Sequence, residues 1–193
     1  MNNTETYKRI VDTTYALFAE HGIDKTSMAM IAKEVGITKP AVYYYFSSKE
    51  ELVDFLFEEI CKEIDFAKYF TIEAYTKNNF QAKLLSDGFK MIQDQENDAF
   101  FSRVINEYIL VSIRNEKYRQ TFYSITEGFM NGFVDLLTKG AQFGVVTNEK
   151  LTTKAQLLSM VIDNIGNYML MGFNIDYNEI WAEAVHNVFK SED

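Results

Sequence analysis

The short stretch TKPAVYYYF, residues 38–46, gathers side chains that can recognise another molecule without covalent chemistry. Its lysine offers an ammonium donor, its proline and alanine offer small apolar surfaces, and each tyrosine offers a flat ring with a hydroxyl. The sequence contains no nucleophile elbow, no P-loop and no HExxH motif. The stretch therefore predicts binding rather than catalysis.

Three consecutive tyrosines cannot all face a protein core if this stretch is helical. At about 100° per residue, Val42 and Phe46 point in the same direction, which we take as the core side. Tyr44 then points nearly the opposite way, and Tyr43 and Tyr45 lie on the two flanks. The pattern predicts a helix whose outer surface is aromatic.

The elements around this helix have the layout of a DNA-binding helix-turn-helix. The segment TSMAMIAKEVGITKPAVYYYF contains two short helices joined by a turn with a glycine, and the motif spans about residues 27–46. Lys39, Pro40, Ala41 and Tyr44 form the exposed N-terminal edge of the second helix, which is the part that reaches bases. Lys39 can donate to guanine, and Pro40 and Ala41 can contact thymine methyl groups.

Neighbouring helix starts add places for phosphate contacts. Lys49 and the free N–H groups at the start of the next helix form one such place, and Thr26 or Ser27 offers another. Two alternatives stay open: a solvated helix whose aromatic flanks pack on their neighbours, and a half-buried Tyr45 against the first helix. The predicted DNA contacts are Thr26, Ser27, Thr38, Lys39, Pro40, Ala41, Tyr43, Tyr44, Tyr45 and Lys49.

The whole chain follows a helical pattern, which predicts an all-α fold of about nine helices. Apolar residues recur at helical spacing, and no strand-like alternation persists. The single proline, Pro40, lies in a first helical turn, where its missing N–H costs little. A first helix ends near Gly22, two short ones follow to Phe46, and the others cover about 48–68, 76–94, 97–114, 117–140, 152–173 and 176–190.

We expect two domains. Residues 1–47 form the helix-turn-helix domain and residues 48–193 form a regulatory domain, with 48–68 as the connecting helix. Residues 1–49 carry six basic and five acidic side chains, whereas the remainder carries 13 basic and 23 acidic ones. The net charge of −9 therefore comes from the second domain, which indicates that the first has a different partner.

Composition narrows the remaining possibilities. The chain has 193 residues, of which 47% are hydrophobic and 15% aromatic, so it can build a sizeable core. Cys61 is the single cysteine, and His21 and His186 have no ligand partners at metal-binding spacing. We expect no metal and no cofactor. The sequence shows no signal peptide and no membrane-spanning apolar run, which predicts a cytoplasmic protein.

Residues 8–55 resemble the DNA-binding domain of TetR-family (tetracycline-repressor-type) bacterial regulators. The matching string is ALFAEHGIDKTSMAMIAKEVGITKPAVYYYFSSKEELV, with the family hallmarks LF…HG, T…IA…G, YYYF and SKEEL. The later helices match this family in number, length and order. The resemblance implies a homodimer, a palindromic operator, and a C-terminal domain that binds a small molecule and releases DNA.

The regulatory segment is rich in Phe, Tyr and Met, which either form a core or line an adaptable pocket for a small hydrophobic effector. Three acids lie in apolar surroundings, where each faces solvent, pairs with an arginine or lysine, or lines the pocket and favours a lipophilic cation. The predicted pocket residues are Phe66, Phe89, Phe101, Glu107, Tyr108, Phe122, Tyr123, Glu127, Met130 and Asp163.

The last two helices, at 152–190, carry apolar stripes. The family resemblance implies that such helices form a four-helix dimer interface, and burial within one chain is the alternative for each residue. The predicted interface residues are Leu158, Val161, Ile165, Tyr168, Met169, Ile180, Trp181, Ala184, Val185 and Val188.

The sequence thus predicts a ligand-responsive repressor. Two helix-turn-helix units held about one DNA turn apart would enter successive major grooves of a palindromic operator. A protein of the same scaffold that answers to a protein partner, or to no ligand, is the second reading. An all-α enzyme is the third, because no catalytic constellation appears.

Overall fold

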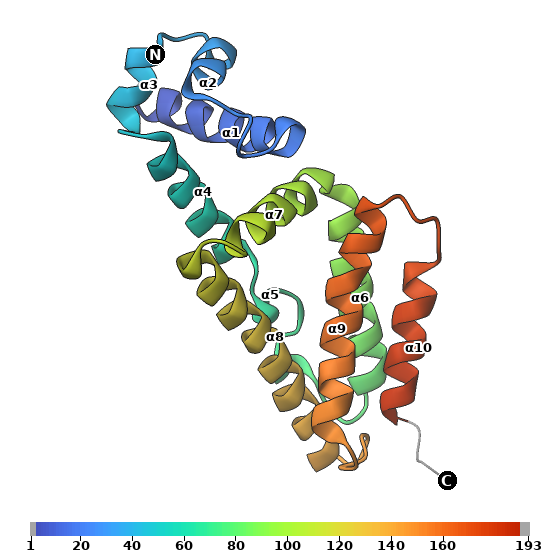
Figure 1. Ribbon diagram of the computed structural model, residues 1–193. Coiled ribbons are helices and arrows are strands. Elements are labelled where there is room, and N and C mark those ends of the chain that lie inside the picture. The colour runs from blue at the N-terminus through green and yellow to red at the C-terminus, as the bar shows by residue number, and fades with distance from the viewer. Residues whose placement is uncertain (1–2, 190–193) are drawn as a thin grey trace. The chain divides into compact units, whose positions relative to one another are not determined.

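The computed structural model describes residues 3–189, which are helical and contain no β-strand (Figure 1). This confirms the all-α prediction, with ten α-helices in that range where about nine were expected. No helix among these residues is both long and apolar enough to cross a membrane. The elements are α1 (Asn3–His21), α2 (Met28–Val35), α3 (Lys39–Tyr45), α4 (Lys49–Glu63), α5 (Phe66–Tyr69), the 3-10 turn η1 (Ile72–Ala74), α6 (Phe80–Asn97), α7 (Ala99–Ser112), α8 (Glu116–Gln142), α9 (Leu151–Leu170) and α10 (Tyr177–Phe189).

The chain divides into two compact units. The N-terminal unit contains residues up to 63 together with 100–119, and the C-terminal unit contains 64–99 and the residues from 120 onward. Helix α7 and the first turn of α8 therefore belong with the helix-turn-helix, although they are far from it in sequence. The predicted division after residue 47 follows chain order, whereas these units follow spatial contact.

In the N-terminal unit, α7 and α8 pack on α4 through aromatic rings. The ring centroid of Phe57 lies 5.1 Å from that of Tyr108 and 4.5 Å from that of Tyr118. The hydroxyl of Tyr108 donates a hydrogen bond to the backbone carbonyl of Val53 at 2.8 Å. Since buried aromatic pairs add to simple area burial, these rings explain why residues 100–119 join this unit.

In the C-terminal unit, α6, α9 and α10 lie side by side and pack pairwise (Figure 1). Trp181 of α10 is fully buried, and its indole N–H donates to the carbonyl of Leu84 at 3.3 Å. A Cβ atom at Gly88 would lie 2.0 Å from the indole nitrogen. Only glycine lets the tryptophan ring approach α6 so closely.

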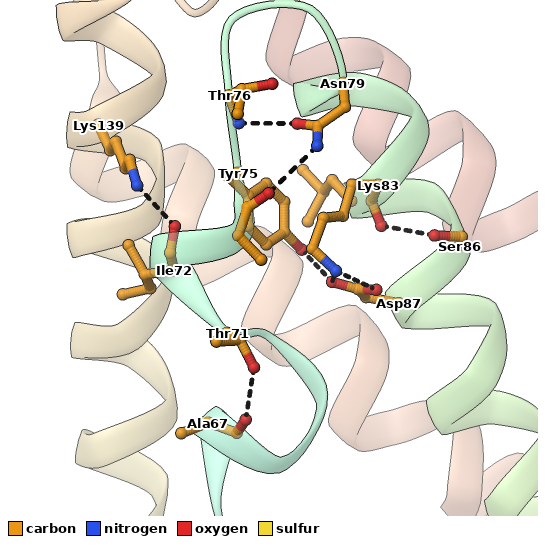
Figure 2. A network of polar contacts seen from close by, with 12 residues as sticks. Ala67, Thr71, Ile72, Tyr75, Thr76, Asn79, Lys83, Ser86, Asp87 and Lys139 are labelled. Carbon is orange, nitrogen blue, oxygen red and sulfur yellow. Dashed lines mark hydrogen bonds and ion pairs between the residues drawn. The ribbon is translucent and has the colours of Figure 1, made fainter.

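Polar contacts fix the segment that enters α6 (Figure 2). Tyr75 donates its hydroxyl hydrogen bond to Asp87 at 2.6 Å, and the ammonium of Lys83 lies 3.0 Å from the same carboxylate. Burial, followed by the hydrogen bond to Asp87, raises the pKa of Tyr75, so the ring stays a neutral donor. Lys139 of α8 donates to the carbonyl of Ile72 at 2.8 Å, which ties η1 to α8.

The prediction that the fourth helix continues to about residue 68 is wrong. Helix α4 ends at Glu63, and the separate short helix α5 begins at Phe66. Asp65 has an extended backbone, and its carboxylate accepts a hydrogen bond from the N–H of Ala67 at 3.0 Å. Because this carboxylate caps a new helix start, the chain turns where apolar periodicity alone suggests continuity.

Candidate nucleic-acid interface

Helix α3 is short, and both of its ends are defined by local contacts. Thr38 is its N-cap, and its hydroxyl oxygen accepts a hydrogen bond from the N–H of Ala41 at 3.3 Å. Pro40 lies in the first turn, as the sequence predicts. The N–H of Phe46 donates to the carbonyl of Val42 at 3.1 Å and closes the helix. The polar cap and the proline fix where the N-terminal end of α3 begins.

Of the two hydroxyl residues that could cap α2, Ser27 is the one that does so. Ser27 is the N-cap, and its side chain accepts from the N–H of Met30 at 3.3 Å. Thr26 is buried, and its hydroxyl donates to the carbonyl of Gly22 at 2.9 Å and contacts that of Leu17 at 3.3 Å. The hydroxyl of Thr26 is thus bonded inside the protein, whereas Ser27 is exposed, and a DNA contact by either residue stays a prediction.

The outer face of α3 is the one expected from helical geometry. Val42 and Phe46 are buried, at 0% and 2% exposed, whereas Tyr44 is 76% exposed and Tyr43 is 42% exposed. The ammonium of Lys39 lies 5.7 Å from the centre of the Tyr43 ring, within cation–π range. Two buried side chains thus hold an exposed face that combines a cation with two rings.

Tyr45 divides its surface between α1 and α3. It is half-buried, with its ring centroid 6.4 Å from that of Tyr7 and 5.2 Å from that of Tyr44. The Tyr7 ring also stacks on Phe46 at 5.3 Å. The expected packing of Tyr45 on the first helix is confirmed. Tyr7 itself escaped sequence reasoning, because its partners lie more than 35 residues away in the chain.

At the start of α4, several groups that could bind a phosphate already have hydrogen-bond partners within the protein. The carboxylate of Glu51 accepts from the N–H of Ser47 at 2.7 Å and from its hydroxyl at 2.6 Å, and these bonds lower the pKa of Glu51. Ser48 accepts from the N–H of Glu51 at 3.0 Å. Lys49 donates to the carbonyl of Asp24 at 3.2 Å, so its ammonium already supports the α1–α2 turn. A phosphate contact by Lys49 stays a prediction.

The arrangement suits non-covalent recognition of a nucleic acid. The exposed Lys39 and Pro40, with half-buried Ala41, lie at the N-terminal end of α3, and exposed rings follow. Among the described residues, no group of three or more His, Cys, Asp or Glu side chains could hold a metal ion. The chemistry available on this face is hydrogen bonding, apolar contact and stacking.

Comparison with known proteins matches the helix-turn-helix segment to a described family. Residues 10–56, which include α2, α3 and the first half of α4, match the family described as bacterial regulatory proteins, tetR family. Residues 10–56 therefore form a DNA-binding domain of the TetR family. This match, together with the relatives below, indicates a DNA-binding transcriptional regulator rather than an enzyme.

Similarity to TetR-family proteins extends over the full length. The fatty acid metabolism regulator protein of Bacillus subtilis (strain 168) is 25% identical over 192 residues, which cover 94% of this chain and 96% of that protein. The fatty acid degradation regulator FadR from Bacillus halodurans has the same fold, with a TM-score of 0.68 and 18% identity over 100% of this chain and 98% of that one. A SmeT–triclosan complex matches with a TM-score of 0.71 and 16% identity over 97% and 93%.

The predicted pocket residues fall in both units. Phe101, Glu107 and Tyr108 belong to the N-terminal unit, and the others belong to the C-terminal unit. Tyr108 is buried with its hydroxyl on a backbone carbonyl, and Glu107 accepts from the N–H of Ile23 at 2.9 Å. These two side chains have structural partners of their own.

In the C-terminal unit, the aromatic side chains fill the core. Phe66 lies 5.0 Å from both Phe70 and Phe133 between ring centroids, and Phe133 lies 6.2 Å from Trp181. Such distances are those of packed rings, so Phe66 is a core residue. Phe89 is half-buried against the same core.

The remaining predicted pocket residues lie nearer the surface. Phe122 and Met130 are half-buried, whereas Tyr123, Glu127 and Asp163 are exposed. Tyr123 donates to Glu127 at 3.4 Å. Surface hollows of about 430 Å³ and 420 Å³ include Phe89 and Glu107 respectively among their lining residues, and another of about 570 Å³ is lined by Phe80, Leu85 and their neighbours.

The predicted dimer stripe is mostly inside the chain's own core. Helices α9 and α10 turn most of these side chains toward each other and toward α6, within the core of the C-terminal unit. Val161 and Met169 are half-buried against the same core, and Tyr168 and Ile180 are exposed. The predicted interface residues that are buried in this core are Leu158, Ile165, Trp181, Ala184, Val185 and Val188, and a part for them in a dimer stays a prediction.

Proposed function

We propose that the protein is a cytoplasmic, ligand-responsive repressor that binds a palindromic operator as a homodimer. The observation that carries this proposal is the exposed edge of α3, where Lys39 and Tyr44 project from a helix anchored by buried Val42 and Phe46. An exposed aromatic and cationic face of this kind needs a partner, and major-groove DNA matches it in chemistry and shape.

A second apolar surface supports the homodimer. Leu157, Met160 and Tyr168 of α9 are 45%, 56% and 45% exposed, and helical spacing places them on one face. Ile180 of α10 is exposed as well. In the dimer proposed here, this stripe packs against its copy and holds two α3 helices about one DNA turn apart.

The proposed effector is a small hydrophobic molecule, with acyl-chain compounds as the first class to test. A regulator of fatty acid metabolism is similar to this chain over nearly its whole length, and a fatty acid degradation regulator shares its fold. The triclosan complex of a protein with this fold shows that such a scaffold accepts a hydrophobic ligand. The effector weakens operator binding by as much as it prefers the DNA-free conformation.

The positions of two of the three acids favour this class over a lipophilic cation. Glu107 is hydrogen-bonded to a backbone N–H, and Glu127 is exposed. Asp163 differs from them, because burial of its carboxyl raises its pKa although part of the residue is exposed. A buried carboxylate that awaits a positive ligand would instead be enclosed and without a partner.

A regulator without a small-molecule effector is the second candidate. The observation that favours it is the close ring packing of Phe66, Phe70, Phe133 and Trp181, which fills the centre of the C-terminal unit. In that case, the C-terminal unit serves dimerisation or contact with a protein partner.

Selection of duplexes from a random DNA pool, followed by effector titration, tests the proposal. We expect the selected DNA to be an inverted repeat, and acyl-CoA or free fatty acids to release it in a fluorescence anisotropy assay. Hydrophobic cations serve as the matched comparison. Enrichment of no sequence would refute the regulator, and operator binding that no compound alters would favour the second candidate.

A further inference from the structure

Glu107 of α7 contacts the first turn of the helix-turn-helix. Its Oε2 atom accepts a hydrogen bond from the N–H of Ile23 at 2.9 Å, across 84 residues of sequence. Both residues belong to the N-terminal unit. A hydrogen bond to an ionised carboxylate is stronger than one between neutral groups. The contact therefore joins the α1–α2 turn to a helix that comes much later in the chain.

The backbone of the turn leaves room for this carboxylate. Gly22 has a φ of +85°, a conformation that other residues rarely adopt. A Cβ atom at Gly22 would lie 2.8 Å from the same Oε2 atom of Glu107. The positive φ favours glycine for the sharp turn after α1, and the missing Cβ leaves room for the carboxylate where it lies.

The same turn sets how α2 and α3 are placed. The buried hydroxyl of Thr26 donates to the carbonyl of Gly22, and Ser27 caps α2 in the next position. The ammonium of Lys49 in α4 donates to the carbonyl of Asp24. The turn is therefore hydrogen-bonded to α1 through the N–H of Gly22 and the carbonyl of Phe18, to α7 through Ile23, and to α4 through Asp24.

We propose that Glu107 is a positioning residue that holds the α1–α2 turn against α7 and so sets the orientation of the helix-turn-helix for DNA. A shift of α7 is then transmitted to the turn through the Ile23 N–H. The part of this inference that concerns DNA rests on the proposed function, whereas the contact itself does not.

Three variants of the full-length chain separate the contact from general stability. Glu107→Ala removes the acceptor, Glu107→Asp keeps the charge but shortens the side chain, and Glu107→Gln keeps an oxygen at the same reach. Glu149→Ala, which removes an exposed carboxylate from the C-terminal unit, is the control. Amide hydrogen exchange at Ile23, measured by NMR, reports the contact without any DNA.

In Glu107→Ala and Glu107→Asp, we expect the amide hydrogen of Ile23 to exchange at least about tenfold faster than in the wild type. The reason is that the lost hydrogen bond is to a charged group. Glu107→Gln should retain most of the protection, and Glu149→Ala should equal the wild type. Affinity for a duplex selected with the wild type should fall several-fold in the alanine and aspartate variants and return in the glutamine variant.

The exchange and affinity measurements test the contact and its role in DNA binding separately. Unchanged Ile23 exchange in both the alanine and aspartate variants would overturn the contact, whatever happens to DNA binding. Faster exchange with undiminished duplex affinity would overturn the positioning role. A wild type that selects no duplex would overturn the proposed function and the positioning role together, and the exchange data would still decide the contact.

Discussion

The ammonium of Lys39 lies 5.7 Å from the centre of the Tyr43 ring, on the exposed face of α3. The pair lies one helical turn apart, so each side chain restricts the other before any partner arrives. Preorganised side chains lose less conformational entropy on binding. In the proposed complex, this face would present partly ordered side chains to DNA.

Replacement of either member of this pair should weaken operator binding. Lys39→Ala or Tyr43→Ala is expected to cost about 1–3 kcal/mol of binding free energy, because each removes a direct contact to DNA. Fluorescence anisotropy with a selected duplex measures the change. Lys90→Ala, an exposed lysine of α6, is the control and should bind as the wild type does. Full affinity in both α3 variants would refute the face assignment.

Two aromatic residues of this segment should behave in opposite ways. Phe46→Ala is expected to lower the free energy of unfolding by about 3–5 kcal/mol, because it empties a buried site against Tyr7 and Phe55. Tyr44→Ala should change stability by less than about 0.5 kcal/mol, because its ring is exposed. Urea denaturation followed by circular dichroism compares them. Equal losses would show that Tyr44 is also a core residue.

Much of this interface could be predicted from the sequence because its determinants are local. The Thr38 cap, Pro40 and the 100° step from Val42 to Phe46 fix a short helix and its buried side within nine residues. The position of Thr26 could not be predicted, since two adjacent hydroxyls suit an N-cap equally well. Packing decided between them by burying one.

The predicted dimer interface on α9 could not be located from sequence periodicity alone. Helix α9 has apolar residues on two faces, one with Leu158 and Ile165 and the other with Leu157 and Tyr168. The pattern does not say which face packs on α6 and α10. Contacts such as Glu107 with Ile23 are harder still, because neither residue carries a local signal of its partner.

The exposed face of α9 should govern the oligomeric state. Leu157→Glu combined with Met160→Glu is expected to convert the dimer to monomer, because buried charges without partners are costly at an interface. Sedimentation velocity measures the change in mass. Thr152→Glu, at an exposed position outside the stripe, should leave the dimer intact. A dimer that persists in the double variant would place the interface elsewhere.

Gly88 and Gly128 offer a matched pair of tests for the C-terminal unit. Gly88→Ala should destabilise the protein by about 1–3 kcal/mol or more, because the new methyl group would overlap the Trp181 ring. Gly128→Ala meets no atom within 4 Å and should be stabilising by up to about 1 kcal/mol in the middle of α8. Thermal unfolding measures both. A harmless Gly88→Ala would contradict the packing of α10 on α6.

Cys61 should be a poorly reactive thiol at neutral pH. Burial, followed by the negative charge of Glu58, raises its pKa to about 11. At pH 7.5 we expect alkylation by iodoacetamide roughly a hundredfold slower than that of an ordinary thiol, with full reactivity restored in urea. Labelling at the rate of an exposed cysteine would contradict the burial.

The same shift gives a pH dependence of stability with a definite sign. The folded state keeps the Cys61 proton to a higher pH than the unfolded state does. The free energy of unfolding therefore falls as pH rises from about 8.5 to about 11, and it is unaffected at neutral pH. Cys61→Ser should remove this decline, and urea denaturation at pH 7.5 and 10 measures it.

Photocrosslinking from position 44 tests the DNA-binding role of α3 most directly. Tyr44→p-benzoylphenylalanine places the reactive group on the most exposed ring of this helix, and the same substitution at exposed Tyr123 of α8 is the control. With a selected palindromic duplex, crosslinks from position 44 should map to base positions in two half-sites about 10 base pairs apart. Tight, sequence-specific binding without any crosslink from position 44 would contradict the account.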